Sequence, residues 1–169
     1  RVRLALEPEP ACMLETTGET LDFFNGELFS DTSAARFAEL TGAGEADSAR
    51  FLRNSLGVCL DTCHAAVMFE EPLDMAISLS RAGINIVKLQ LTAALAVERM
   101  SPAALRGLRA FEDPVYLHQT TVSGPDGLTH YLDLPQACAE YRADAGPASW
   151  RSHFHVPVFL EELGDFHST

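Results

Sequence analysis

Short apolar runs alternate along the chain with longer segments in which apolar residues recur at helical spacing. Residues 2–6 and 56–60 have the pattern of short strands. Residues 84–91 form a nearly continuous apolar run, as expected for a strand that is covered on both faces. Residues 153–159 supply a last strand. Because helical segments separate these runs, the pattern predicts strand–helix–strand units and a parallel sheet.

Residues that commonly start and stop helices bound the segments between these runs. Thr16 and Glu19 have the spacing of a capping box, which predicts a helix from about Thr17. Pro72 and Gly83 are typical of a first helical turn and a helix end, so a second helix is predicted between them. Its buried face is expected to hold Leu73, Ala76, Ile77 and Ser80. Further helices are predicted to begin near Ser33, Ser101 and Leu134.

One segment departs from this alternation. Residues 115–122 and 129–132 flank a turn-forming run at 123–127, which predicts an antiparallel hairpin with a longer turn. We interpret the chain as the C-terminal portion of an α/β fold, a (β/α)8 TIM barrel that carries the β-hairpin as an insertion. A complete barrel needs roughly 200 to 250 residues. Residues 1–169 are therefore expected to form one partial-barrel domain, with further strands at both ends.

The composition limits the classes of partner. The chain has 24 acidic and 12 basic residues and a formal net charge of −12, without the basic stripe that nucleic-acid binders show. Nucleic acid is therefore not expected as a partner. No apolar run approaches the roughly 18 residues of a membrane span, and the four cysteines lack the spacing of a secreted disulfide scaffold. We expect a cytoplasmic protein with reduced thiols.

Ionisable residues gather where the predicted strands end. Asp61 and His64 follow the second strand, and a residue three positions on returns to the same side of a helical turn. The pair would then reach one divalent ion, and mixed oxygen and nitrogen donors suit Zn²⁺, Mn²⁺ or Fe²⁺. Taken alone, Asp61 and His64 are better explained as a helix-capping aspartate and a surface histidine.

Two further pairs have the two-residue spacing of strands. His153 and His155 would project from one face of the strand, where two imidazoles can bind a metal ion or an anion. For such a pair seen alone, a solvated strand end is the favoured alternative. Glu7 and Glu9 share the alternation, but a proline after each makes the chain rigid. We therefore expect one glutamate of the two to be a ligand.

Lys88, Gln90 and His118 complete the candidate residues. Lys88 lies among apolar residues of a predicted strand, where a buried ammonium needs a partner or a polar site. That argument favours a functional and a structural role equally. His118 falls in the predicted hairpin, and a structural role is favoured for it.

Residues 56–64, Leu-Gly-Val-Cys-Leu-Asp-Thr-Cys-His, resemble a stretch of endonuclease IV, a member of the xylose isomerase-like TIM barrel superfamily. The resemblance implies that Asp61 and His64 bind metal, and that Glu7 bridges metal ions. His153 and His155 resemble a later Asp-x-His ligand pair, with His153 in place of the aspartate. Lys88 stands where that enzyme has a histidine ligand, which implies one or two ions in place of three. A further glutamate ligand is expected beyond residue 169.

A second resemblance covers nearly the whole chain. Residues 6–10 (Leu-Glu-Pro-Glu-Pro), 88–91 (Lys-Leu-Gln-Leu), 113–119 (Asp-Pro-Val-Tyr-Leu-His-Gln) and 150–157 (Trp-Arg-Ser-His-Phe-His-Val-Pro) follow the order of one metabolite-traffic protein family. This family is member E of the Ebo gene cluster (EboE). It is associated with movement or processing of a secondary-metabolite precursor. The resemblance implies a small-molecule metabolite, and other proteins of the same gene cluster, as partners.

These observations predict a metal-binding protein that handles a small polar metabolite or a secondary-metabolite precursor by metal-assisted isomerisation or epimerisation. Lys88 is expected to stabilise an oxyanion, Glu9 or His118 to act as the base, and Gln90 to contact the substrate. The residues expected to hold one or two divalent ions (Zn, Mn or Fe) are Glu7, Asp61, His64, His153 and His155.

Two alternatives stay open. The first is a non-enzymatic metabolite-binding or carrier module, which Lys88 at a former ligand position favours. The second is a phosphodiesterase similar to endonuclease IV, against which the net charge of −12 argues.

Overall fold

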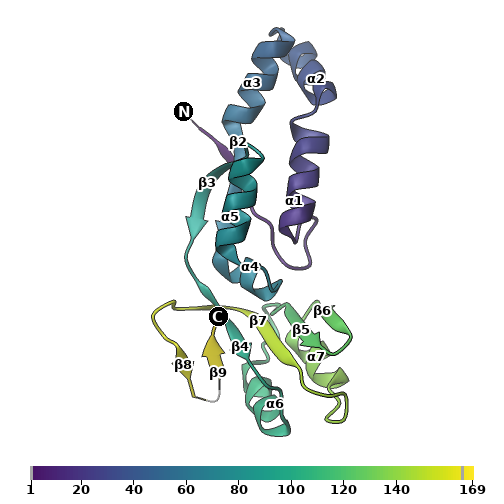
Figure 1. Ribbon diagram of the computed structural model, residues 1–169, viewed down its shortest axis with the longest axis vertical. Helices are drawn as coiled ribbons and strands as arrows, with labels where there is room; N and C mark the ends of the chain where they lie inside the picture. Colours follow the sequence, from purple (N-terminus) through teal and green to yellow (C-terminus); the bar gives the residue numbers. More distant parts are fainter. Residues whose placement is uncertain (1, 165) are drawn as a thin grey trace. The chain divides into compact units, whose positions relative to one another are not determined.

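The computed structural model describes residues 2–164 and 166–169, and these residues form two compact units. The first unit comprises the chain up to Asp61 together with Glu71–Gln90. The second comprises Thr62–Glu70 and Leu91–Thr169. The chain therefore passes between the units three times, and each unit contains its own sheet (Figure 1).

A three-stranded parallel sheet forms the centre of the first unit. Its order is β1-β2-β3, with β1 at Leu4–Leu6, β2 at Leu56–Asp61 and β3 at Asn85–Gln90. All three predicted strands are therefore present and parallel. Gly57 is required where β2 and β3 approach, because a Cβ there would lie 2.3 Å from the Asn85 carbonyl oxygen.

Local signals place most helices of the first unit. The capping box is formed: the Thr16 Oγ1 accepts from the Glu19 N–H, and the Glu19 carboxylate accepts from the Thr16 N–H at 2.9 Å. Gly42, at φ +71°, ends one helix and separates it from the next. The elements are α1 (Thr17–Phe23), a π-helical turn η1 (Phe24–Leu28), α2 (Asp31–Thr41), α3 (Glu45–Ser55) and α5 (Pro72–Arg81).

Two expectations about these helices are wrong. Helix α3 was not expected, because its sequence is mostly polar and lacks an apolar stripe. Helix α5 buries Met75 and Leu79, whereas Leu73 of the predicted face is 70% exposed. Apolar residues surround much of α5, so periodicity alone did not fix the buried side.

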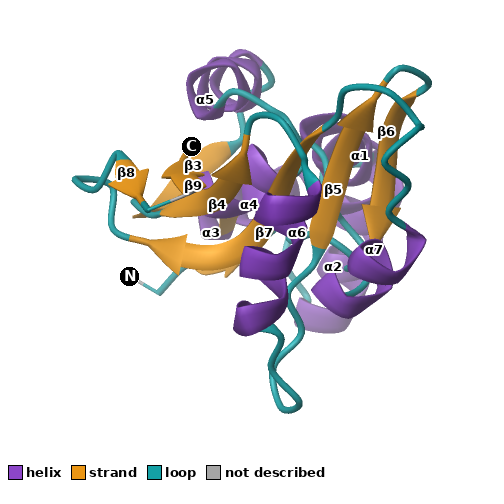
Figure 2. Cartoon of the chain, turned by 90° about the horizontal axis from the view of Figure 1, so that it is seen from below, coloured by secondary structure: helices purple, strands orange, loops and turns teal. Residues whose placement is uncertain are grey.

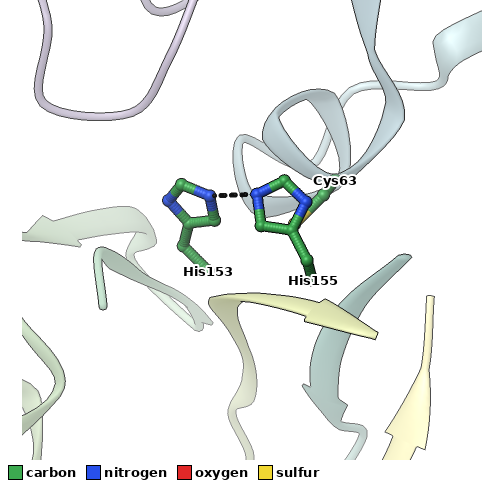
Figure 3. Close-up of side chains that lie close together, drawn as sticks. All are labelled: Cys63, His153 and His155. Carbon is green, nitrogen blue, oxygen red and sulfur yellow. Dashed lines mark hydrogen bonds between the residues drawn. The ribbon is translucent and has the colours of Figure 1, made fainter. Parts of the chain in front are cut away.

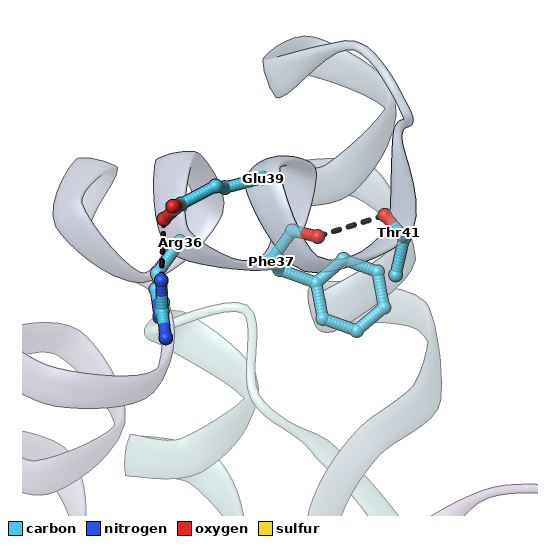
Figure 4. A network of polar contacts seen from close by, with 4 residues as sticks. All are labelled: Arg36, Phe37, Glu39 and Thr41. Carbon is cyan, nitrogen blue, oxygen red and sulfur yellow. Dashed lines mark hydrogen bonds and ion pairs between the residues drawn. The ribbon is translucent and has the colours of Figure 1, made fainter.

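On the exposed side of α2, Arg36 pairs with Glu39, and Thr41 donates to the Phe37 carbonyl (Figure 4).

The second unit contains a six-stranded antiparallel sheet of order β6-β5-β7-β4-β9-β8 (Figure 2). The strands are β4 (Ala93–Val97), β5 (Thr120–Gly124), β6 (Gly127–Tyr131), β7 (Ser149–Val156), β8 (Glu162–Leu163) and β9 (Phe166–Ser168). The helices are α4 (Thr62–Val67), α6 (Pro102–Leu108), the 3₁₀ turn η2 (Arg109–Phe111) and α7 (Leu134–Glu140).

Strand β4 divides the apolar packing of this unit between two faces. Leu95 and Val97 belong to the main core, which includes Leu108 of α6 and Leu134 of α7. Ala94, on the opposite face by strand alternation, packs with Cys63, Ala66 and Val67 of α4. Helix α4 is thereby held on one face of the sheet, while α6 and α7 cover the other.

The second sheet overturns the expectation of a partial TIM barrel, because all its strand pairs are antiparallel. The predicted hairpin is present as β5 and β6, but it belongs to this sheet and is not an insertion on a barrel. Strand β3 is an edge strand with Leu89 53% exposed, so the expectation of cover on both faces is also wrong. Apolar runs of this length occur in parallel and antiparallel strands alike, which explains the error.

Among the described residues, no helix combines the length and the apolar character needed to cross a membrane.

Candidate metal centre

Helix α4 begins directly after β2 and brings Cys63 and His64 to the second sheet, where both are buried. Its first residue is fixed because the Thr92 N–H donates to Thr62 Oγ1 at 3.0 Å. At its C-terminal end, Arg151 of β7 donates to the Ala66 carbonyl at 2.9 Å. Helix α4 is therefore held at its start by the segment before β4 and at its end by β7.

An irregularity in β7 places the other two histidines. Leu95 pairs with Ser152, but Ala93 pairs with Val156, so residues 153–155 of β7 lie opposite Ala94 alone. This is a β-bulge, a feature that re-aims side chains and is frequent beside active sites. The sequence predicted that His153 and His155 share a face by regular alternation. Both imidazoles lie beside His64 of α4, and Phe154 between them packs against the main core on the other face.

Three imidazole nitrogens converge between α4 and β7. The Nε2 atom of His153 lies 3.1 Å from Nε2 of His64 and 3.0 Å from Nε2 of His155. Figure 3 shows the His153 and His155 rings facing each other beside Cys63. His64 is buried, His153 is half-buried and His155 is exposed. The group therefore has a protein-covered side and a side open to solvent.

Two side chains orient these rings through their other nitrogen. Gln119 Oε1 lies 2.7 Å from His153 Nδ1, and since a carbonyl oxygen only accepts, His153 Nδ1 carries the proton. His155 Nδ1 lies 3.1 Å from the Thr92 hydroxyl. In a neutral His153 the Nε2 atom is then unprotonated and carries a lone pair. It lies close to the Nε2 atoms of His64 and His155. Hydrogen bonds of this type are the usual support of metal-binding histidines.

Cys63 is a fourth donor that sequence reasoning did not assign to the site. Its Sγ lies within 4.8 Å of ligand nitrogens of His153 and His155, and its thiol lies 3.5 Å from the Phe154 carbonyl oxygen. From the sequence Cys63 was expected only to be one of four reduced thiols, and its burial agrees with a packing role. Only its position beside His64 could have signalled a second role.

The spacing of these donors suits a tetrahedral zinc ion. With Zn–N bonds of roughly 2.0–2.1 Å, two tetrahedral nitrogen ligands lie roughly 3.3 Å apart. The observed Nε2 separations of 3.0 and 3.1 Å are slightly shorter. Small ring movements would therefore admit the ion. The described residues thus include a group of imidazole and thiol donors that fits a transition metal.

The first unit holds a second polar cluster, at the ends of its parallel strands. The Gln90 amide donates to Glu7 at 2.6 Å and also to Asp61, while the Lys88 ammonium donates to the Gln90 oxygen. Glu7 follows β1, Asp61 ends β2, and Lys88 and Gln90 belong to the last three residues of β3. The carboxyl edge of such parallel sheets commonly binds ligands.

This cluster also acts on the thiol of Cys59, which lies beneath it in β2. Burial, and then the negative charge of Glu7, raise the pKa of Cys59 to about 11. The thiol is therefore protonated at neutral pH and is no nucleophile.

The two residues predicted to serve as a base, Glu9 and His118, belong to different units. Glu9 belongs to the loop after β1, where its backbone bonds with Leu14 and Cys12. His118 belongs to the second unit and stacks on Phe154, with ring centroids 3.9 Å apart. Its Nδ1 is buried and has no hydrogen-bond partner among the described residues. Neither position adds support to the role of a base.

The predicted site residues are thus divided between the units. The second unit brings together His64, His153 and His155, and the first brings together Glu7, Asp61, Lys88 and Gln90. The roles of Glu7 and Asp61 as metal ligands, and of Lys88 and Gln90 toward a substrate, stay predictions.

Comparison with known proteins yielded no matching family model, and neither curated proteins nor solved structures gave a significant match.

Proposed function

We propose that this protein binds a divalent transition-metal ion, Zn²⁺ in the first place, through His64, His153 and His155, with Cys63 as a further donor. The bound ion then holds a polar group of a small metabolite. The proposal rests on one observation above all: the Nε2 atom of His153 lies 3.0–3.1 Å from two other Nε2 atoms.

That convergence is difficult to explain without a cation. The lone pair on His153 Nε2 accepts one good hydrogen bond, yet two imidazoles approach it at hydrogen-bond distance. A metal ion accepts the lone pairs of all three rings at once, and Gln119 and Thr92 already hold the outer nitrogens of two.

With the three histidines as ligands and Cys63 beside the ion as an alternative donor, the site would keep one position for an exchangeable ligand. Structural zinc sites are closed by four protein donors, whereas catalytic sites commonly use three and leave one position to water or substrate. His155 is exposed, so the ion would be reachable from solvent. A bound Zn²⁺ would polarise a carbonyl or hydroxyl group of the metabolite.

Metal-assisted isomerisation or epimerisation is the reaction that this site would serve within the proposal. A metabolite-binding or carrier role is the second candidate, and the polar cluster of the first unit favours it. There Lys88, Gln90, Glu7 and Asp61 hydrogen-bond to one another, an arrangement suited to holding a polar ligand. Metabolite binding that persists after chelation of the metal would favour the carrier.

The first experiment is elemental analysis of the full-length protein, followed by titration of the metal-stripped protein with Zn²⁺. The single tryptophan, Trp150, lies in β7 three residues before His153 and serves as a fluorescence reporter. We expect about one zinc ion per chain. In His153→Ala the zinc affinity should fall at least about 100-fold, because one of the three histidine ligands is removed.

The matched control is His167→Ala, since His167 is an exposed histidine of β9. This variant should retain the affinity of the unaltered protein within about twofold, as expected for a surface change. Equal zinc affinity in His153→Ala and His167→Ala would contradict the proposal.

A further inference from the structure

Cys63 places a thiol beside the imidazole group on its protein-covered side. The Sγ atom lies within 4.8 Å of ligand nitrogens of His153 and His155, and Cys63 is 0% exposed. It packs with Ala66 and Ala94, on the face of the second sheet that α4 covers. His155, in contrast, is exposed. An ion held by the histidines would therefore have a thiol on its inner side and solvent on its outer side.

The thiol is close enough to bind the same ion. A sulfur and a nitrogen on one tetrahedral zinc ion lie roughly 3.5 Å apart, because Zn–S and Zn–N bonds measure roughly 2.3 and 2.0–2.1 Å. The separations in the structure are at most 4.8 Å, so a shift of roughly 1 Å would close the difference. The Cys63 thiol donates to the Phe154 carbonyl at 3.5 Å. Since a thiol is a weak donor, this bond is lost at small cost.

Two groups would compete for the position that three histidine ligands leave open on a tetrahedral ion. Cys63 approaches this position from within the protein, and water or a metabolite approaches it from the side of His155. Thiolate sulfur suits zinc well, and a donor of the same chain acts at a high effective concentration. One neutral oxygen is therefore a weak competitor. Two neighbouring oxygens that bind together compete better, because zinc can expand to five ligands.

From this arrangement we infer that Cys63 determines which ligands the ion accepts: its thiolate fills the fourth position until a chelating ligand with two neighbouring oxygen donors displaces it. When the Sγ–metal bond forms, the thiol proton passes to solvent. A proton returns to the sulfur when the chelator takes its place, and no electron is transferred. The inference rests on the proposed function, because it requires the ion. It narrows the metabolite to one with an oxygen pair, such as a hydroxy acid or a hydroxy ketone.

The first measurement uses the full chain loaded with Co²⁺ in place of Zn²⁺, because a cobalt–thiolate bond adds a charge-transfer absorption in the near ultraviolet. We expect this band in the unaltered protein and its loss in Cys63→Ser. The visible absorption of bound cobalt should persist in that variant, since the three histidines still hold the ion. Cys138→Ser is the matched control, because Cys138 is a buried thiol of the same unit that belongs to the main core. This control should keep the band.

The second measurement titrates the cobalt-loaded proteins with two small probes, and metal analysis after dialysis checks that the ion stays bound. Acetohydroxamate offers two oxygen donors and should abolish the thiolate band. Acetamide, which lacks the second oxygen, should leave the band unchanged at the same concentration. In Cys63→Ser the affinity for acetohydroxamate should rise roughly tenfold or more, as expected when a binding-competent state populated at about one tenth becomes dominant.

The outcomes separate this inference from the proposed function. Cobalt that binds without a thiolate band overturns the inference and leaves the metal centre intact. A band that survives saturation with acetohydroxamate overturns the displacement of Cys63, as does equal acetohydroxamate affinity in the unaltered protein and Cys63→Ser. A band that Cys138→Ser removes and Cys63→Ser keeps would assign the sulfur to the wrong cysteine. A chain that binds neither zinc nor cobalt contradicts the proposed function itself.

Discussion

The two units each gather polar side chains where strands end, but the two clusters differ in how their members are satisfied. In the first unit Gln90 stands between an ammonium and two carboxylates, so donors meet acceptors. In the second, three Nε2 atoms of the same kind meet one another. Donor–acceptor pairs thus join the members of the first cluster, whereas a cation would join the imidazoles of the second. Two clusters of similar size therefore differ in the ligand that each would bind.

The largest expected difference between the two clusters comes from replacing one glutamine in each, Gln119 or Gln90, by alanine. Gln119→Ala removes the acceptor that fixes the His153 ring, and zinc affinity should fall roughly 10- to 100-fold. Gln90→Ala, in the first unit, should leave zinc affinity within about twofold. Titration of both metal-stripped variants measures the difference. A comparable loss in both would mean that the two clusters do not act separately.

The converse prediction concerns stability. Gln90→Leu takes the amide donor from Glu7 and Asp61, so the free energy of unfolding should fall by about 2 kcal/mol. Gln136→Leu, at an exposed position of α7, should change it by less than about 0.5 kcal/mol. Denaturant unfolding of the metal-free proteins provides the values. An unaltered midpoint for Gln90→Leu would show that the first cluster contributes nothing to folding.

The smallest expected effect is a pH dependence in the first unit. The pKa of Cys59 is about 11 in the folded protein, above its ordinary value of 9.0. Between these values the unfolded chain has released the proton that the folded chain keeps, so the free energy of unfolding falls as pH rises from 9 to 11. The loss should be of the order of 1–2 kcal/mol.

The Cys59→Ala variant tests this prediction. It should lose part of the alkaline slope and keep the profile of the unaltered protein below pH 8, where the Cys59 thiol is protonated in both states. The remaining slope includes Cys138, whose pKa burial also raises. Identical slopes in variant and unaltered protein would rule out the assigned role of Cys59.

Local signals predicted individual elements well. The capping box at Thr16 and Glu19 and the Pro72 start of α5 appear where the sequence indicated. The hairpin is also present, but β5 begins only at Thr120 and Gly124 pairs with Gly127, so its turn is shorter than predicted. Each depends on bonds or backbone preferences of residues at most four positions apart. Helix α3 was missed for the same reason, since its polar sequence carries no strong local signal.

The candidate site was predictable only in part. The sequence nominated His64, His153 and His155 through the resemblance of residues 56–64 and 153–155 to a known metal-binding motif, since spacing alone favoured structural roles for them. It gave no reason to include Gln119 or Thr92, which come from separate segments and act through the outer ring nitrogens.

The sequence by itself determined the short-range features of this protein: where helices start, where the hairpin turns, and which side chains carry chemistry. The tertiary structure decided the direction and order of the strands, the β7 bulge, and the placement of Cys63 near His153 and His155. These depend on pairing and packing between residues as many as 90 positions apart. Apolar periodicity does not encode such pairing, because one pattern buries equally well in several sheets.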